Sequence, residues 1–115
     1  MHELSIALSI VDGVLEELDL QKLGKVEVVY VRLGQLSGVD KDALSFSYEV
    51  ACEGTALVNS RLVIEEVAVA ILCSACGVER RTRSFPLLAC AECGAAGERV
   101  LHGEELEITA MEMVH

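Results

Sequence analysis

Four of the five cysteines stand in two short pairs in the second half of the chain. Two residues separate the members of each pair, and thirteen residues lie between the pairs. The four are Cys73, Cys76, Cys90 and Cys93. Hairpins of this kind converge on one metal ion, because a two-residue gap lets a tight turn aim both sulfurs inward. Gly77 and Gly94 follow the pairs and permit the backbone conformation that turns amides toward the thiolates.

Four soft thiolates in a closed tetrahedral set favour Zn²⁺, or less often iron. No coordination position is left for a substrate, so the site is expected to be structural. A redox dithiol and unrelated free thiols are the alternatives, and the presence of two pairs together favours a metal. A module of about thirty residues buries too little apolar surface to fold alone, so metal binding is expected to supply the missing free energy.

The first three residues offer a second set of donors. The large side chain of His2 is expected to leave Met1 in place with a free α-amine. This amine, the His2 backbone nitrogen and the imidazole can chelate one ion in a plane, because the fused rings form without strain. Square-planar nitrogen and oxygen donors suit Ni(II) or Cu(II). A fourth donor could come from Glu3 or from Asp40 in the turn at residues 38–40. Spacing alone leaves open that His2 is an ordinary surface residue.

Apolar periodicity places both sets of donors on a small α+β framework. Three- and four-residue spacing predicts a helix from Glu3 to about Leu23 and a second one from Ala43 to Gly54. The spacing of the second helix rests on Ala43, Leu44, Phe46, Ser47 and Val50. Strand patterns cover residues 25–33, 61–72 and 105–113.

We therefore predict a small mixed β-sheet of about three strands packed with two helices, carrying an inserted zinc-ribbon-like module with a four-cysteine site. The strands that flank the module are expected to pair within one sheet, since sequential elements usually lie side by side. The predicted domains are residues 1–70 with 104–115, which carry the N-terminal donors, and residues 71–103, which carry the cysteines.

Composition limits the classes of function. A chain of 115 residues fits one domain, or a small domain with a smaller metal-stabilised one. A net charge of −10 disfavours nucleic acid and anionic lipid as partners. The arginines of the module are interpreted as a solvated or partner-facing patch: Arg80, Arg81, Arg83 and Arg99. No apolar run reaches the roughly 18 to 20 residues of a membrane span, and no basic secretory start is present, so we expect a cytoplasmic protein.

Three segments together resemble the HypA/HybF family of nickel-insertion accessory proteins for [NiFe] hydrogenase. They are Met-His-Glu-Leu-Ser at residues 1–5, Gly-Gln-Leu-Ser-Gly at residues 34–38 and the paired cysteines. The resemblance covers essentially the whole chain, including residues 46–51 and 103–106. It implies a metallochaperone that binds one Ni(II) reversibly at its N-terminus and holds zinc separately at the two cysteine pairs. No catalysis is implied, and the sequence has no Ser/His/Asp-like set or phosphate-binding glycine loop.

Carried over by residue, the resemblance makes His2 the main nickel ligand, with Met1, Glu3 and Asp40 as further contributors. It assigns zinc to Cys73, Cys76, Cys90 and Cys93. Ala91 departs from the family pattern, in which a proline often follows the third cysteine. The change loosens that turn slightly and leaves the ligands intact.

The resemblance also implies two protein partners, a nickel-handling GTPase and the [NiFe] hydrogenase large-subunit precursor. Some relatives also serve urease. The sequence leaves open a homodimer, as well as any influence of the zinc site on nickel binding. The alternative function is a zinc-ribbon interaction adaptor without a nickel role. His102 and His115 are interpreted as surface and terminal residues, and Cys52 as a small apolar core residue.

Overall fold

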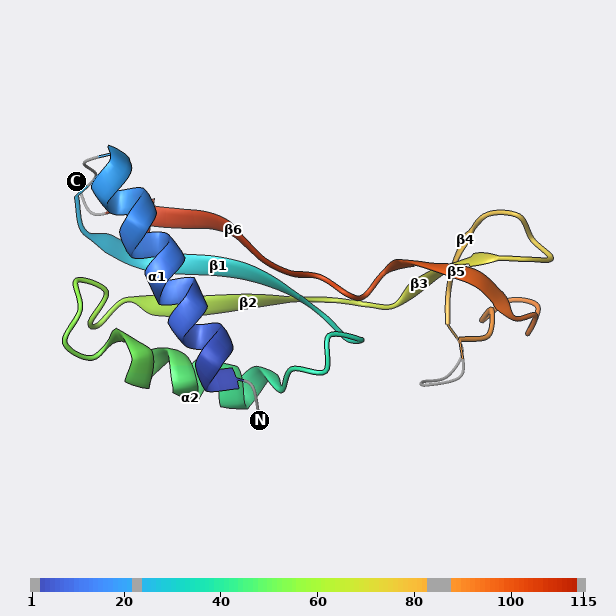
Figure 1. The fold of residues 1–115 in the computed structure, drawn as a ribbon. Coiled ribbons are helices and arrows are strands. Elements are labelled where there is room, and N and C mark those ends of the chain that lie inside the picture. Colours follow the sequence, from blue (N-terminus) through green and yellow to red (C-terminus); the bar gives the residue numbers. More distant parts are fainter. Residues whose placement is uncertain (1–2, 22–23, 83–87, 114–115) are drawn as a thin grey trace. The chain divides into compact units, whose positions relative to one another are not determined.

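The computed structural model describes residues 3–21, 24–82 and 88–113 and contains two helices and two small sheets in this part of the chain (Figure 1). The elements are α1 (Glu3–Gln21), β1 (Val26–Gly34), α2 (Lys41–Cys52), β2 (Arg61–Val67), β3 (Ala70–Cys73), β4 (Glu79–Arg81), β5 (Gly97–His102) and β6 (Leu106–Met113). The strand orders are β2-β1-β6 and β4-β3-β5. The predicted α+β class, with two helices and a small sheet of about three strands, is confirmed, and the module that carries the cysteines has a three-stranded sheet of its own.

The chain divides into two compact units, and each is described by itself. Unit 1 comprises Met1–Arg32, Gly38–Glu65 and Glu107–His115, and it holds both helices with most of the first sheet. Unit 2 comprises Leu33–Ser37 and Glu66–Leu106, and it holds the second sheet with all four paired cysteines. No helix among the described residues is long and apolar enough to cross a membrane.

The core of unit 1 is mainly aliphatic and joins both helices to the central strand β1. On α1 the buried residues follow helical spacing, at Ala7, Ile10, Val11 and Val14. They pack in one cluster with Val26, Val29 and Val31 of β1. Buried side chains occur on both faces of β1, in keeping with its valine-rich sequence.

Helix α2 is present as predicted, but the face assigned to the core is partly wrong. Phe46 is 68% exposed and Val50 is 42% exposed, whereas Leu44 and Tyr48 are buried. The buried Tyr48 hydroxyl keeps a hydrogen-bond partner, because it lies 2.7 Å from the Ser60 hydroxyl. Asp40 caps the start of the helix, since its Oδ1 accepts the Ala43 amide at 2.9 Å.

Unit 2 is built around β3, which pairs antiparallel with β4 on one side and β5 on the other. Its buried core is small and consists of Val69, Ile71, Cys73 and Cys90. Gly97 packs directly over Ile71, since a Cβ at this position would lie 2.9 Å from the Ile71 Cδ1 atom. Two of the four residues in this core, Cys73 and Cys90, are also candidate metal ligands.

The predicted strand at residues 61–72 is in fact two strands in two sheets. Gln35 lies at the break: its amide donates to the Val67 carbonyl at 3.1 Å, and its side-chain oxygen accepts the Val69 amide at 3.1 Å. Polar groups at the end of β2 are thus satisfied by Gln35, and the chain enters the second sheet at Ala70. The strands that flank the module, β2 and β6, share a sheet as predicted, but β1 lies between them.

Candidate metal sites

The two cysteine pairs form hairpins with the same backbone hydrogen bonds. In the first, the Cys73 amide donates to the Val78 carbonyl at 3.1 Å, and the Gly77 amide donates to the Cys73 carbonyl at 2.9 Å. The second repeats this pattern at 2.8 Å and 2.9 Å, with Cys90, Ala95 and Gly94 in the equivalent places. Both glycines have a positive φ, 73° at Gly77 and 78° at Gly94, which side chains other than glycine adopt at a cost.

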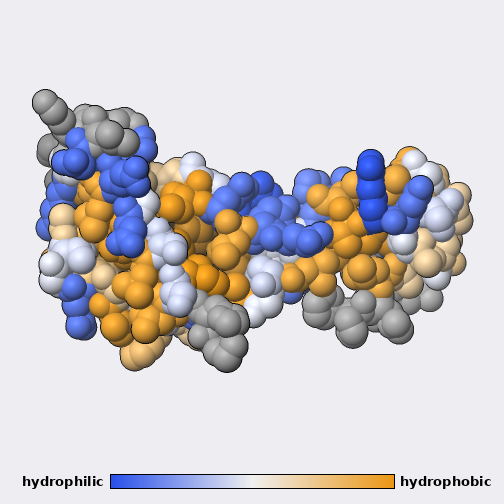
Figure 2. All heavy atoms as spheres, in the orientation of Figure 1, coloured by the Kyte–Doolittle hydropathy of each residue, from blue (hydrophilic) through white to orange (hydrophobic). Residues whose placement is uncertain are grey.

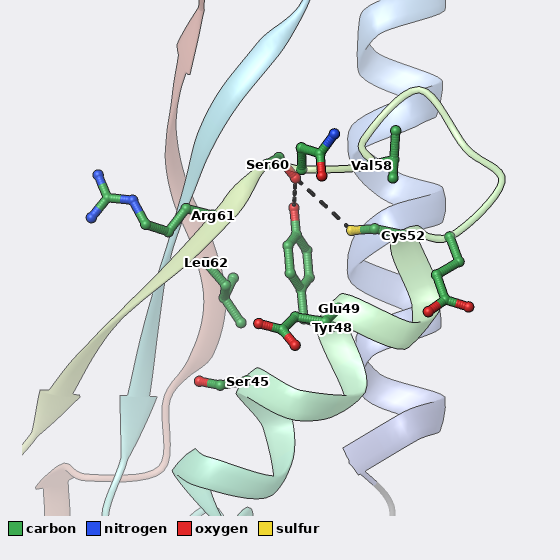
Figure 3. A pocket seen from close by; sticks show the side chains of 10 residues that line it. Ser45, Tyr48, Glu49, Cys52, Val58, Ser60, Arg61 and Leu62 are labelled. Atoms are coloured by element: carbon green, nitrogen blue, oxygen red, sulfur yellow. Dashed lines mark hydrogen bonds between the residues drawn. The ribbon is translucent and has the colours of Figure 1, made fainter.

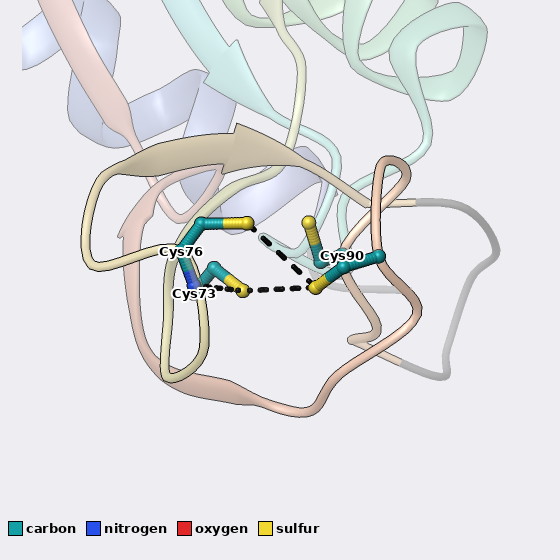
Figure 4. A group of neighbouring side chains, drawn as sticks. Cys73, Cys76 and Cys90 are labelled. Carbon is teal, nitrogen blue, oxygen red and sulfur yellow. Dashed lines mark hydrogen bonds between the residues drawn. The ribbon is translucent and has the colours of Figure 1, made fainter.

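The hairpins bring the four sulfurs together, and all four lie within 4.8 Å of one another. The Cys93 sulfur is 3.5 Å from that of Cys73 and 3.7 Å from that of Cys76. Figure 4 shows Cys73, Cys76 and Cys90 pointing toward a common centre. No pair is a disulfide. A zinc–sulfur bond of about 2.3 Å in tetrahedral geometry requires sulfurs about 3.8 Å apart, so the group fits one such ion.

Backbone amides make two of these thiols good metal ligands. The Cys93 amide lowers the pKa of the Cys90 thiol to about 6, and the Cys76 amide, 3.3 Å from the Cys73 sulfur, lowers the pKa of Cys73. At Cys93 the Ala95 amide acts in the same direction, but hydrogen bonding to the Cys73 sulfur and burial outweigh it and raise the pKa to about 11. A cation at the centre would favour the thiolate at every position.

Of the N-terminal donors, Met1 and His2 lie outside the described residues, while Glu3 and Asp40 lie within them and are in contact. Glu3 is the first residue of α1 and is 6% exposed. Its Oε2 accepts the Asp40 amide at 3.0 Å. The structure therefore brings together the start of α1 and the residue that caps α2, although 37 positions separate them in sequence.

Arg80 is less exposed than expected for a member of a solvated or partner-facing patch of arginines. It is half-buried, and its interaction with the Cys76 thiol raises the pKa of Arg80. Its neighbour Arg81 is exposed. The sequence gives no signal that separates the two arginines, because strand pairing decides which of them is the more buried.

His102 is in contact with two glutamates of unit 2. Its Nδ1 lies 3.3 Å from Glu105 and its Nε2 lies 3.6 Å from Glu79, and the ring is 48% exposed. These contacts join β5 to β4 and to the residue before β6. They account for His102 as a surface residue, in line with its interpretation from the sequence.

Cys52 and Tyr48 line a pocket of about 510 Å³ at the end of α2 (Figure 3). The Ser60 hydroxyl donates to the Leu57 carbonyl at 2.6 Å, so the Tyr48 hydroxyl, 2.7 Å away, is the donor in their contact. Burial raises the pKa of Tyr48. The Cys52 sulfur lies 3.9 Å from the same Ser60 oxygen and is 3% exposed. These contacts attach the end of α2 to the turn before β2 and give Cys52 a packing role.

The fold and the cysteine cluster define a small metal-binding protein with an α+β unit and a zinc-ribbon-like module. Residues 1–113 match the family described as hydrogenase/urease nickel incorporation, metallochaperone, hypA. The chain belongs to this HypA family. The assignment confirms the resemblance seen in the sequence and the expectation that the protein is a maturation factor of the metallochaperone class, without catalytic activity.

Relatives and solved structures agree with this assignment. The hydrogenase maturation factor HypA of Chloroflexus aggregans is 42% identical over 97% of this chain and 98% of its own length. That of a Roseiflexus species is 43% identical over 97% and 91%. The solution structure of the Ni metallochaperone HypA from Helicobacter pylori has a TM-score of 0.67 at 24% identity, covering 99% of this chain and 98% of that one. Another HypA solution structure gives a TM-score of 0.71 at 24% identity, with coverage of 99% and 97%. At this identity the structures support the fold alone.

Proposed function

We propose that this chain is a nickel metallochaperone that binds Ni(II) at its N-terminus and delivers it to the large subunit of [NiFe] hydrogenase during maturation. His2 is the main nickel ligand, and Met1, Glu3 and Asp40 contribute further donors. The observation that carries the proposal is the contact between Glu3 and the Asp40 amide, because it ties the residue after His2 to a second carboxylate-bearing segment.

This contact fixes the position of Glu3 at the start of α1. Glu3 is buried, so its carboxylate holds position, and its place in the first turn also suits the positive end of the helix dipole. Asp40 is exposed and carries a second carboxylate next to Glu3. Such a site at a chain end permits exchange of nickel ligands with a partner, which a buried cage does not.

The four cysteines are proposed to hold one resident Zn(II) per chain. Their spacing supports this assignment, as do the burial and the lowered thiol pKa values of Cys73 and Cys90. Zinc, when bound, supplies free energy of folding to a module whose own apolar core is small. We place the zinc-binding domain at residues 71–103 and the nickel-binding domain at residues 1–70 with 104–115.

The proposed partners are the nickel-handling GTPase of the maturation system and the hydrogenase large-subunit precursor, both in the cytoplasm. We assign part of the GTPase-binding surface to α1, through Glu16 and Glu17. Figure 2 shows apolar side chains at the surface of the helical part of unit 1, and the exposed ones on α1 include Leu4 and Leu8. Charge reversal of both glutamates is expected to weaken complex formation with the GTPase. The net charge of −10 supports partners other than nucleic acid or membrane.

Nickel titration of the zinc-loaded chain tests the proposal. Wild type is expected to bind one Ni(II) with the visible absorption of a planar complex, and His2→Ala is expected to lose it. His102→Ala serves as the matched control, because His102 pairs with glutamates in unit 2 and is expected to leave the titration unchanged. Planar nickel absorption that survives His2→Ala would reject the nickel assignment and favour an adaptor role.

A further inference from the structure

The outer face of α2 exposes apolar side chains that the core of unit 1 does not use. Phe46 is 68% exposed and Val50 is 42% exposed, and because they are four positions apart they lie on the same side of the helix. Beyond the end of α2, Val58 is 44% exposed in the segment that leads to β2. A largely exposed phenylalanine with further exposed apolar residues beside it is typical of a surface that another protein covers.

Acidic side chains border this apolar face. Asp42, Glu49 and Glu53 lie on α2 or at its end, and all three are exposed. None of them forms an ion pair within the described part of the chain. The only basic residue of α2 is Lys41, at its first position. A protein that covers this face has to bring Lys or Arg to its border, because like charges across an interface oppose binding. A second copy of the chain brings the same carboxylates and is a poor occupant.

The pocket at the end of α2 offers a place for one basic side chain of such a protein. Glu49, Glu53 and Val58 are among the residues that line its volume of about 510 Å³. Arg61 also lines the pocket, but its side chain extends away from Cys52 (Figure 3). Carboxylates beside an apolar side chain suit Lys or Arg, because the charged group pairs with the carboxylates while the aliphatic stem contacts the apolar part.

We propose that the outer face of α2 is a docking surface for a protein partner whose contact surface is apolar and bordered by Lys or Arg. It is separate from the surface on α1 that is assigned to the GTPase. The recipient of nickel is the partner that fits this place, because Asp40 caps the start of α2 and its amide contacts the Glu3 carboxylate, and a recipient has to reach these donors. The inference rests on the nickel function proposed above.

Titration of the full-length, zinc-loaded chain with the purified hydrogenase large-subunit precursor tests this surface. The double variant Phe46→Ser with Val50→Ser is expected to weaken binding about tenfold or more, since aromatic anchors carry much of the affinity of an interface. Ile108→Ser is the matched control, because Ile108 is 41% exposed on β6 of the same unit, and it is expected to bind as wild type does. Glu49→Lys with Glu53→Lys is expected to slow association and to reduce its dependence on salt.

Further readouts separate docking from other effects. Thermal unfolding and nickel titration of the α2 variants are expected to match those of wild type, because the changed side chains are exposed and lie outside the proposed nickel site. Equal precursor affinity for the double variant and wild type, loss of affinity for the GTPase alone, or dissociation of a wild-type dimer by the double variant would overturn the proposal. A wild-type chain that does not bind the precursor would overturn the partner assigned under the proposed function, and this is seen before any variant is compared.

Discussion

The two units of this chain hold their candidate metal donors in different ways. In unit 2 two matched hairpins hold four sulfurs within 4.8 Å, and two of these sulfurs form part of the buried core. In unit 1 the described donors, Glu3 and Asp40, sit at the start of two helices whose core is complete without them. Candidate metal donors can thus form part of the core of a unit or lie at its edge. The first arrangement suits a resident ion, and the second suits cargo.

Removal of zinc should give the largest difference between the two units, because only unit 2 holds the four cysteines. We expect a strong chelator to unfold unit 2, since zinc supplies roughly 10 kcal/mol or more in small zinc modules. Amide signals of residues 73–82 and 88–93 should collapse toward unfolded positions in an NMR spectrum.

The signals of unit 1 provide the control for this experiment. Buried residues such as Val29 and Leu44 should keep their shifts, because their cluster contains no residue of unit 2. Unchanged signals at residues 73–93 after complete zinc removal would show that the module folds without its ion.

A methyl group at Gly34 should cause the next largest effect, again confined to unit 2. A Cβ at Gly34 would overlap the carbonyl of Gly103, whose oxygen also accepts the Leu36 amide at 2.6 Å. We expect Gly34→Ala to lower the free energy of unfolding by about 3 kcal/mol or more, measured by urea titration.

Gly13→Ala is the matched change in unit 1. The nearest atom to a Cβ there is the Cδ1 of Ile108 at 3.9 Å, which is ordinary contact. Within a helix this substitution should stabilise the protein by about 0.5 to 1 kcal/mol. Destabilisation of equal size by both alanines would contradict the described approach of Gly34 to Gly103.

Substitutions at Asp40 should have the smallest effect on stability and can sharpen the account of unit 1. Asp40→Ala removes the side chain that caps α2 and should cost about 1 kcal/mol of stability. Asp40→Asn keeps a good cap, so thermal unfolding should stay near that of wild type. If Asp40 also binds nickel, both variants should weaken nickel affinity, and calorimetry with Ni(II) would detect this. Wild-type nickel affinity in Asp40→Asn would leave Asp40 with its capping role alone.

Local patterns predicted much of this molecule, and long-range contacts explain where they fell short. The cysteine hairpins follow from spacing and from two glycines with positive φ, all within a few residues. The break after β2 depends on Gln35, which is distant in sequence from the Val69 amide that it accepts. The buried face of α2 depends on Ser60, which gives the Tyr48 hydroxyl its partner. Likewise, Arg80 and Arg81 look alike in the sequence and differ only after the strands pair.

The central claim is that one chain carries a resident zinc ion and an exchangeable nickel ion in separate sites. Metal content after dialysis against a mild chelator tests it most directly, with wild type and His2→Ala each incubated with both ions beforehand. We expect both proteins to retain one zinc per chain, and wild type to hold nickel before dialysis and lose it afterwards, while His2→Ala takes up none. Nickel retained at the level of zinc through dialysis, or zinc lost together with nickel, would contradict the account.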